Sequence, residues 1–436
     1  MTVLASGAAP VPPRQAVGNR LMAGPPGGVG HEPLAAHQRR LSVRPSGGPG
    51  LIELLRQSGL RGRGGAWFPT WRKWEAVARH SDGNSIVVVN ASEGEPLSKK
   101  DGILITLRTH LVLDGAALAA ETLGAKDIVL YLAKGSETTR SSVEDALRER
   151  RLAHLPEPSV QIVWTDHRYI SGESSAVVNR VSGGPAKPRF SLQRAAESGV
   201  DGRPTLVQNA ETLAHVALIA RYGSNWFRQL GTPDSPGSAL MTLSGNVNQP
   251  GVYEVDLGAQ LDGVLEAAGG TVSPAGGALI GGYFGNWLAA SSLAGLPLDP
   301  EHLQSQYGAS LGCGILAILP QSGCAIVESA SIIDYLAGET ADQCGPCVNG
   351  LAALAETMRR IAASNPESTD IDRVWRWTNM VRGRGACHHP DGAVGQLSSA
   401  LSVFKDHLRS HLSGQRCYGV HVGGFPQPPR SSEASR

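Results

Sequence analysis

The residues best suited to chemistry begin in a glycine-rich stretch, RGRGGA at 61–66, with Lys73 close behind it. Glycines let a backbone approach a phosphate or a flat ring closely, because they carry no Cβ. Consecutive N–H groups can form an anion-binding nest, and a lysine adds a point charge. A plain flexible loop is the competing interpretation, and the spacing is not the GxGxxG pattern that follows a strand in dinucleotide-binding folds. The stretch therefore needs support from other motifs.

Three polar segments follow, NASEGEP at 90–96, YISGESSA at 169–176 and QNAETL at 208–213. The carboxylates and amide of the first could bind ribose hydroxyls or a flavin edge, and its alternative is a solvated acidic turn. The second could place an aromatic ring and a carboxylate near a nucleotide, while the third opens a helix with amide side chains suited to a phosphate or sugar. Their alternatives are a helix cap with a core tyrosine and an ordinary N-terminal capping segment.

The cysteines suggest a metal centre. Cys344 and Cys347 have C-x-x-C spacing, which can grip one metal centre from one turn, and Cys387 could close the site from a distant helix. A zinc knuckle would need a second C-x-x-C pair, and a thioredoxin-like pair would need a βαβ context. His388 and His389 could donate a nitrogen ligand, although such a pair is more typical of a surface. Three more cysteines lack partner spacing and are expected to be ordinary buried or free thiols: Cys313, Cys324 and Cys417.

Length and composition narrow the class of protein. A chain of 436 residues is too long for one core and predicts two to four domains. A formal net charge of +1 argues against a nucleic-acid partner. We expect no membrane-spanning helix and no secretory signal, because long apolar runs are missing. Six cysteines in so long a chain are not a disulfide framework, which favours a reducing, cytoplasmic setting with some cysteines as ligands.

The elements that must position these motifs fall into three parts. Apolar strands at 85–90, 127–132 and 160–164, with a helix at 111–123, predict a parallel α/β layer whose ligands lie at the strands' carboxyl ends. Strands at 239–244, 251–255 and 277–281 with a helix at 261–268 predict a small β-rich module. Helical periodicity at 329–336, 347–362, 370–380 and 395–412 predicts a C-terminal bundle, and 221–237 is expected to be a linker.

In this order the motifs resemble one family, the flavoprotein subunit of respiratory complex I and of related hydrogenases and formate dehydrogenases. The family's R-G-R-G-G-A-G-F-P-T-G-x-K-W aligns with RGRGGAWFPTWRKW here, and N-x-D-E-x-E-P aligns with NASEGEP. Its Y-x-x-G-E-E-T-A-L aligns with YISGESSAV, and P-T-x-x-N-N-x-E-T-L aligns with PTLVQNAETL. The resemblance covers about residues 50 to 412 and identifies the chain as a divergent member.

The resemblance implies a fold and a division into domains. It implies a Rossmann-like α/β domain that binds FMN with NADH stacked over its ring, a ubiquitin-like β-grasp module of the SLBB type, and a helical iron–sulfur bundle. The expected boundaries are a disordered lead-in over 1–49, the FMN/NADH domain over 50–225, the β-grasp module over 238–292, the bundle over 325–412 and a disordered tail over 413–436.

The resemblance also implies the site. The cofactor-binding residues would be Gly62, Arg63, Gly64, Gly65 and Lys73 in the phosphate loop, Asn90, Glu93 and Glu95 at the flavin and nucleotide, Tyr169, Gly172 and Glu173 at the nicotinamide, and Asn209 and Thr212 at the flavin tail. The cluster ligands would be Cys344, Cys347 and Cys387. NADH would pass hydride to FMN, and electrons would leave through an iron–sulfur cluster to a ferredoxin or a membrane reductase subunit. Hydride transfer needs no general base, so no catalytic residue is nominated.

One departure from the family concerns the cluster. The family motif is C-x-x-C-x-x-C-x-x-G, and its first cysteine is Ala341 here. A [4Fe–4S] cluster normally takes four thiolates. One iron would therefore need Asp342, a histidine, a water or a partner's side chain, and a [3Fe–4S] centre or an empty site stays open.

Other departures fall in the nucleotide pocket. Trp67 stands where the family has glycine, and its indole would either block the nicotinamide or stack on the flavin. Ser92 replaces an aspartate, Ser174 a glutamate and Gln208 an asparagine. Together they keep open a second hypothesis, a non-catalytic or altered-donor relative that acts as an electron relay or scaffold.

Overall fold

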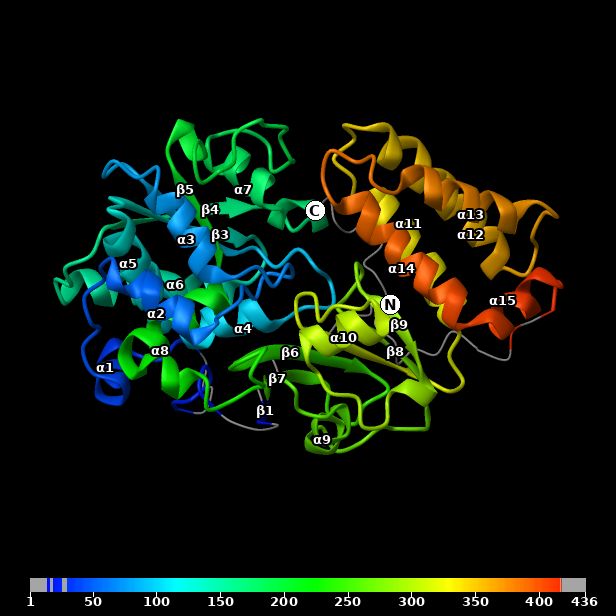
Figure 1. Ribbon diagram of the computed structural model, residues 1–436, viewed down its shortest axis with the longest axis horizontal. Helices are drawn as coiled ribbons and strands as arrows, with labels where there is room; N and C mark the ends of the chain where they lie inside the picture. The colour runs from blue at the N-terminus through cyan, green and yellow to red at the C-terminus, as the bar shows by residue number, and fades with distance from the viewer. Residues whose placement is uncertain (1–13, 16–18, 26–29, 416, 418–436) are drawn as a thin grey trace, which may run out of the picture.

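The computed structural model describes residues 14–15, 19–25, 30–415 and 417, and these residues form three bodies (Figure 1). An α/β body from the first half of the chain lies on one side, and a yellow-to-orange helical bundle lies on the other. A β-rich body lies below and between them. This arrangement agrees with the three predicted parts.

The α/β body is built on a four-stranded sheet with the order β4-β3-β2-β5, all parallel. Its strands are β2 (Ile86–Ala91), β3 (Asp127–Ala133), β4 (Ser159–Thr165) and β5 (Thr205–Asn209). The predicted strands and their parallel pairing are confirmed. The chain adds β3 and β4 on one side of β2 and then crosses to add β5 on the other. In such sheets the crevice outside the carboxyl ends, at this reversal, is where ligands bind.

Helices cover both faces of this sheet, which explains why β2 reads as an uninterrupted apolar run. They are α1 (Leu34–Leu41), α2 (Gly50–Ser58), α3 (Thr70–Ala78), α4 (Lys100–Leu107), α5 (Thr109–Leu123), α6 (Glu137–Leu152), α7 (Ser174–Val181) and α8 (Ala210–Phe227), with 3₁₀ turns η1 (Tyr169–Gly172) and η2 (Val200–Gly202). The closest helix packing is at Gly115 of α5, where a Cβ would collide with the carbonyl oxygen of Leu213 in α8.

The β-rich body has a six-stranded sheet with the order β1-β7-β6-β10-β8-β9. Its elements are β1 (Arg14–Gln15), β6 (Ser238–Gly245), β7 (Gly251–Asp256), α9 (Leu261–Ala267), β8 (Ala275–Ile280), β9 (Asn286–Ala289), η3 (Ala290–Ser292), α10 (Pro300–Tyr307) and β10 (Ile315–Pro320). The three predicted strands are present. β10 was not predicted from the sequence. It lies beyond residue 292 in the chain but occupies the middle of the sheet, parallel to β6.

The bundle contains α11 (Ala325–Gly338), the π-helical turn η4 (Pro346–Leu351), α12 (Ala352–Ala362), α13 (Asp370–Val381), α14 (His389–Val403) and α15 (Lys405–Leu412). The single helix predicted over 395–412 is wrong, since two helices meet at Phe404. That residue leaves helical geometry, with φ −105° and ψ 50°, and its ring packs edge-on against Trp287 at 5.6 Å between centroids.

Two further expectations need correction. The predicted disordered lead-in over 1–49 is not wholly irregular, because its described residues include α1 and the fully buried Leu21, whose amide donates to the Glu254 carboxylate. The expected linker over 221–237 begins inside α8, which continues to Phe227 across an irregularity at Gly223. The expected disordered tail lies almost wholly outside the described residues.

Among the described residues, no single helix is long and apolar enough to cross a membrane. Only α4 and α5 reach that composition, as a pair bent by 93°.

Candidate functional site

The sheet edge at the strand reversal gathers the predicted motifs. Asn90, the next-to-last residue of β2, is paired in register with Asn209, the last residue of β5. The Asn209 side chain donates to Asp101 at 2.7 Å and accepts from the Glu211 amide at 3.0 Å, which caps α8. The Asn90 side chain donates to the Gly172 carbonyl oxygen at 2.9 Å. Segments separated by more than a hundred residues therefore meet at this edge.

The glycine loop lies against the same edge. A Cβ on Gly64 would lie 3.3 Å from the Asn209 Cβ, and Gly65 has a φ of +108°, a conformation that side chains other than glycine rarely adopt. The Arg63 amide donates to the Thr212 hydroxyl at 2.9 Å. The next three amides, at 64–66, make no hydrogen bond to any described residue. A row of unpaired donors beside a helix start is a fitting cradle for a phosphate.

Lys73 lies on α3, and its side chain reaches β5. Its buried Nζ donates to the Val207 carbonyl oxygen at 2.5 Å, and burial lowers its pKa to about 8. Gln208, next along β5, has a buried side-chain oxygen with no hydrogen-bond partner among the described residues. A desolvated ammonium and an unpaired amide oxygen leave the site short of polar partners, which FMN with its phosphate and its ring N–H fits.

The structure changes the role of one predicted loop residue. The Arg63 guanidinium donates to the Ser238 carbonyl oxygen of β6 at 3.0 Å and to the Arg61 carbonyl oxygen at 3.0 Å. It is fully buried and 3.9 Å from Glu211. Its side chain therefore joins the α/β body to β6, and only its amide faces the cradle. The residue type alone could not distinguish these two orientations.

A buried charge network supports the edge. Lys100 Nζ lies 2.8 Å from Glu211 and 3.0 Å from Asp101. Burial alone would lower the Lys100 pKa, but these two carboxylates hold it above its ordinary value. Burial raises the pKa of Glu211, and Lys100 and Arg63 offset part of that rise. The network fixes Asp101, which in turn holds the Asn209 amide.

Two of the predicted glutamates cap helices. The Glu93 carboxylate accepts from the Asp101 and Gly102 amides at 2.9 and 2.8 Å, which caps α4. The Glu173 carboxylate accepts from the Ser175 amide at 2.8 Å, which caps α7. The helix cap that was the alternative interpretation of the segment at 169–176 is therefore present at Glu173. Burial, followed by repulsion from Asp101, raises the pKa of Glu93.

Glu95 joins the bodies. Its carboxylate accepts from the Tyr169 hydroxyl at 3.0 Å and from the Tyr283 amide of the β-rich body at 2.9 Å. Burial raises its pKa to about 7. Burial and the neighbouring Glu95 carboxylate raise the pKa of Tyr169. Cys313, predicted as an ordinary thiol, lies close enough to Glu95 for that charge to raise its pKa further, after burial.

The Trp67 indole was expected either to block the nicotinamide or to stack on the flavin, but in the structure it packs elsewhere. Trp67 has a φ of +51°, a left-handed backbone conformation that glycine adopts without strain. Its indole N–H donates to the Gly312 carbonyl oxygen at 2.8 Å, and the ring packs into the core of the β-rich body. The Arg63 guanidinium lies 4.5 Å from the ring centroid. Trp67 therefore ties the glycine loop to the β-rich body.

Ser92, another departure, donates to the Asn90 side-chain oxygen at 2.9 Å and so orients that amide.

The three predicted cluster cysteines share one neighbourhood. The Cys347 amide donates to the Cys344 carbonyl oxygen at 3.2 Å, at the start of η4. Burial and the nearby Cys344 and Cys387 raise the Cys347 pKa to about 12. Burial and the Glu173 carboxylate likewise raise the pKa of Cys387. Three thiols converging from two segments fit an iron–sulfur cluster.

Lys187 contacts the segment at Ala341, where the family has its first cysteine. Lys187 Nζ donates to the Ala341 carbonyl oxygen at 3.1 Å and lies 3.7 Å from the Asp342 carboxylate. The histidines after Cys387 do not complete the set. The His388 side chain is fully exposed, and His389 Nε2 contacts the Leu336 carbonyl oxygen at 2.8 Å.

Aromatic rings from the three bodies pack together next to Glu95. The Tyr169 ring lies 4.6 Å from the Phe284 ring and 5.7 Å from the His389 ring, measured between centroids. Phe284 and His389 are 5.4 Å apart. The sequence reading did not predict this cluster, because its members come from all three bodies. Tyr169 was predicted only as a nucleotide contact, and His389 only as a possible metal ligand.

Comparison with known proteins agrees with this geometry. Residues 55–218 match the family described as the Nuo51 FMN-binding domain, residues 240–281 match the SLBB domain, and residues 328–411 match the NADH-ubiquinone oxidoreductase-F iron-sulfur binding region. The structure of an NAD+-reducing [NiFe]-hydrogenase in the H2-reduced state superimposes with a TM-score of 0.75 and 30% identity over 83% of this chain. This chain spans 62% of that hydrogenase chain.

Two relatives are similar over most of their length. The second F subunit of the NADH-quinone oxidoreductase of Rhizobium meliloti (strain 1021) is 31% identical, over 84% of this chain and 90% of that protein. The corresponding F subunit of Streptomyces coelicolor (strain ATCC BAA-471 / A3(2) / M145) is 29% identical, over 89% of this chain and 88% of that protein. The predicted resemblance and the predicted fold class are confirmed. The chain belongs to the family of NADH-quinone oxidoreductase F subunits.

Proposed function

We propose that this chain is an electron-transfer flavoprotein subunit that oxidises NADH through FMN. Bound FMN supplies the conversion between a two-electron hydride and single electrons. The electrons leave through an iron–sulfur cluster in the bundle to a partner, a ferredoxin or a membrane reductase subunit. The relatives' names describe them as subunits, which supports a partner protein of this kind.

The observation that carries the proposal is the cradle at 64–66. Its amides are unpaired among the described residues, Gly64 lies against Asn209 at the strand reversal, and the buried Lys73 ammonium contacts Val207 on the same strand as Asn209. An anion of the size of a terminal phosphate would satisfy both the amides and the ammonium. The residues proposed to hold the flavin phosphate and tail are Gly62, Arg63, Gly64, Gly65, Lys73, Asn209 and Thr212, with the Arg63 amide positioning the Thr212 hydroxyl.

The remaining residues bind and orient the nucleotide. Asn90 and Gly172 are hydrogen-bonded to each other, and Glu93 and Glu173 cap helices whose N-termini face the edge. Glu95 and Tyr169 form a fixed, buried pair where the three bodies meet. We propose that this group holds the nicotinamide over the flavin and excludes water, and that a proton on Glu95 below pH 7 keeps negative charge low there.

Cys344, Cys347 and Cys387 are proposed as the thiolate ligands of a cluster of the [4Fe–4S] type with an incomplete set. Asp342 is the acidic side chain nearest in sequence that could complete it, and it already contributes to the electrostatics of Cys347. Ala341 is the specific observation that favours the second candidate, an altered-donor relay, because a three-thiolate cluster would have an altered potential.

We propose three domains: the FMN/NADH domain over 50–225, the β-grasp module over 238–292 extended by β10, and the bundle over 325–412. We also propose a reducing, cytoplasmic location, because thiolate ligands persist there.

The test is anaerobic reconstitution with FMN, iron and sulfide, followed by titration with NADH. We expect bound flavin and bleaching of its absorption band by NADH. Lys73→Met should lose most of the flavin, whereas Lys126→Met, at an exposed lysine of the same body, should not. Flavin that binds but is never bleached by NADH or NADPH would favour the relay.

A further inference from the structure

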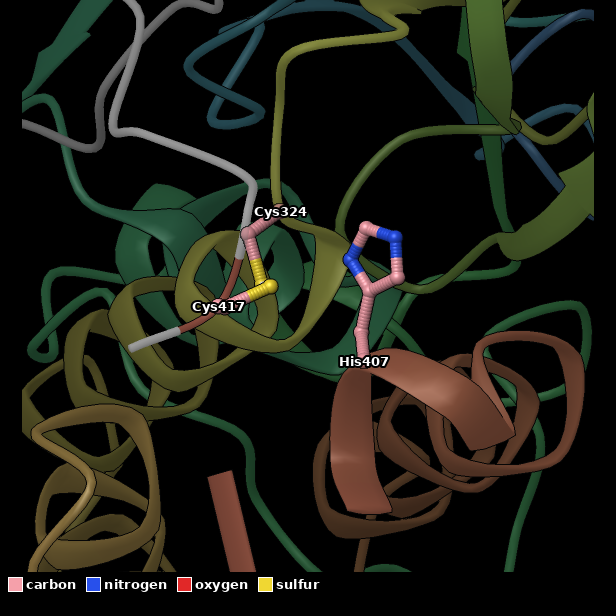
Figure 2. Close-up of side chains that lie close together, drawn as sticks. All are labelled: Cys324, His407 and Cys417. Atoms are coloured by element: carbon pink, nitrogen blue, oxygen red, sulfur yellow. The ribbon is translucent and has the colours of Figure 1, made fainter. Parts of the chain in front are cut away.

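A second group of metal-binding side chains lies at the other end of the bundle. Cys324 is fully buried and directly precedes α11. His407 and His411 are one turn apart on α15, and Cys417 follows a short distance beyond the second histidine. Cys324, His407 and Cys417 bring their ligand atoms within 4.8 Å of one another, and Figure 2 shows the two sulfur atoms together with the His407 ring turned toward them.

Two separations from Cys324 are close to, and slightly shorter than, the edges of a tetrahedral zinc site. Cys324 Sγ lies 3.5 Å from Cys417 Sγ and 3.3 Å from His411 Nε2. With Zn–S bonds of about 2.3 Å and Zn–N bonds of about 2.0 Å, a tetrahedron has S···S and S···N edges of roughly 3.5 to 3.8 Å. The ligand atoms of Cys324, His407 and Cys417 lie within 4.8 Å of one another, and His411 adds a nitrogen beside Cys324, so the group offers two sulfurs and two nitrogens to a single ion.

The two histidines are set up for coordination in different ways. His411 Nδ1 is hydrogen-bonded to the Ser364 hydroxyl at 2.9 Å, which fixes the ring and aims Nε2 at Cys324. Metal-bound histidines usually have their other nitrogen held in this way. His407 Nδ1 is buried without a hydrogen-bond partner among the described residues, and it is the nitrogen that faces the sulfurs in Figure 2. A buried polar atom of this kind requires a partner.

This group is separate from the proposed cluster site. Cys324 precedes α11, whereas Cys344 and Cys347 follow its other end. The fourteen residues of α11 span about 20 Å. That distance exceeds the size of any single metal centre, so the two sites share no ligand.

We propose that Cys324, His407, His411 and Cys417 bind one structural zinc ion that fastens the segment after α15 to the start of α11. A closed set of two thiolates and two imidazoles is typical of structural zinc. The sulfur separation of 3.5 Å is well beyond a covalent S–S bond, and a disulfide would leave His407 Nδ1 unsatisfied.

The first experiment measures zinc and iron in the full-length protein purified under reducing conditions. We expect about one zinc per chain, held against EDTA and independent of iron content. X-ray absorption at the zinc edge should give two sulfurs at about 2.3 Å and two nitrogens at about 2.0 Å. A shell dominated by sulfur would place zinc at the other cysteines and overturn the proposal, as would protein that takes up no zinc on reconstitution.

The matched variants separate the two sites. His407→Gln with His411→Gln should reduce bound zinc at least tenfold while flavin and iron stay unchanged, and His388→Gln, at a fully exposed histidine, should change neither. Zinc retained by the double variant overturns the proposal. If that variant does not fold, the absorption spectrum of the wild-type protein decides. Protein purified under reducing conditions can also be digested without further reductant and mapped by its peptides. A Cys324–Cys417 disulfide in that map overturns the zinc proposal.

Discussion

The proposed phosphate site at 64–66 and the cysteine loop at 341–347 differ in the kind of atom that serves as donor. At the flavin edge, the donors proposed for the phosphate are main-chain amides at 64–66, so changes such as Ser92 and Gln208 leave them in place. The cysteine loop depends on side-chain sulfur, so a single alanine at 341 removes one donor of four. We therefore expect a site whose donors are main-chain amides to keep them when the sequence diverges, whereas a site whose donors are side chains loses one with each such substitution.

The largest expected effect is a loss of stability when the buried charge network around Glu211 is broken. Glu211→Ala would leave Lys100 and Arg63 buried without their shared carboxylate, and the free energy of unfolding should fall by about 3–5 kcal/mol. Urea unfolding measures it. Glu301→Ala is the control, because that carboxylate is half-exposed in its ion pair with Arg61 and should change stability by about 1 kcal/mol or less. Equal effects would mean that the buried network does not support the edge.

The next effect sharpens the comparison at the phosphate itself. Lys73→Met removes a buried, charge-assisted contact of about 2 kcal/mol, so the Kd for FMN should rise about thirtyfold. Flavin fluorescence quenching measures it. An unchanged Kd would show that the amides alone, or another site, hold the flavin.

Repair of the cysteine loop tests the other half of the comparison. Ala341→Cys restores the fourth thiolate, so the cluster should be held more firmly and iron per chain after anaerobic reconstitution should rise toward about four. Iron and sulfide analysis with electron paramagnetic resonance measures the change. Lower iron in this variant than in the wild type would contradict the assignment, and Ala341→Ser is the matched control.

The smallest expected effect is the pH dependence of flavin binding. Burial lowers the Lys73 pKa to about 8, and a bound phosphate would raise it again. Above pH 8 the free protein must take up a proton to bind FMN, so the Kd should rise by at most about tenfold per pH unit. Below pH 8 Lys73 contributes no slope. The Lys73→Met variant should lose the rise, and a rise retained there would assign it to another group.

Much of the fold and part of the site could be predicted from local patterns. The strand at 86–91 and the helix ending at Gly124 follow from apolar runs and a left-handed glycine, and parallel strands place their carboxyl ends at one edge. Long-range facts escaped prediction. Nothing local shows that β10 enters the middle of the second sheet, that Arg63 turns toward Ser238, or that Cys324 meets His411 across 87 residues.

The central claim is that the cradle at 64–66 and Lys73 hold the flavin's phosphate. Its most direct test compares the Kd for FMN with the Kd for riboflavin, which lacks only that group. We predict that FMN binds at least about thirtyfold more tightly to the wild-type protein, and that Lys73→Met removes most of the difference. Equal affinities for the two flavins in the wild type would contradict the account.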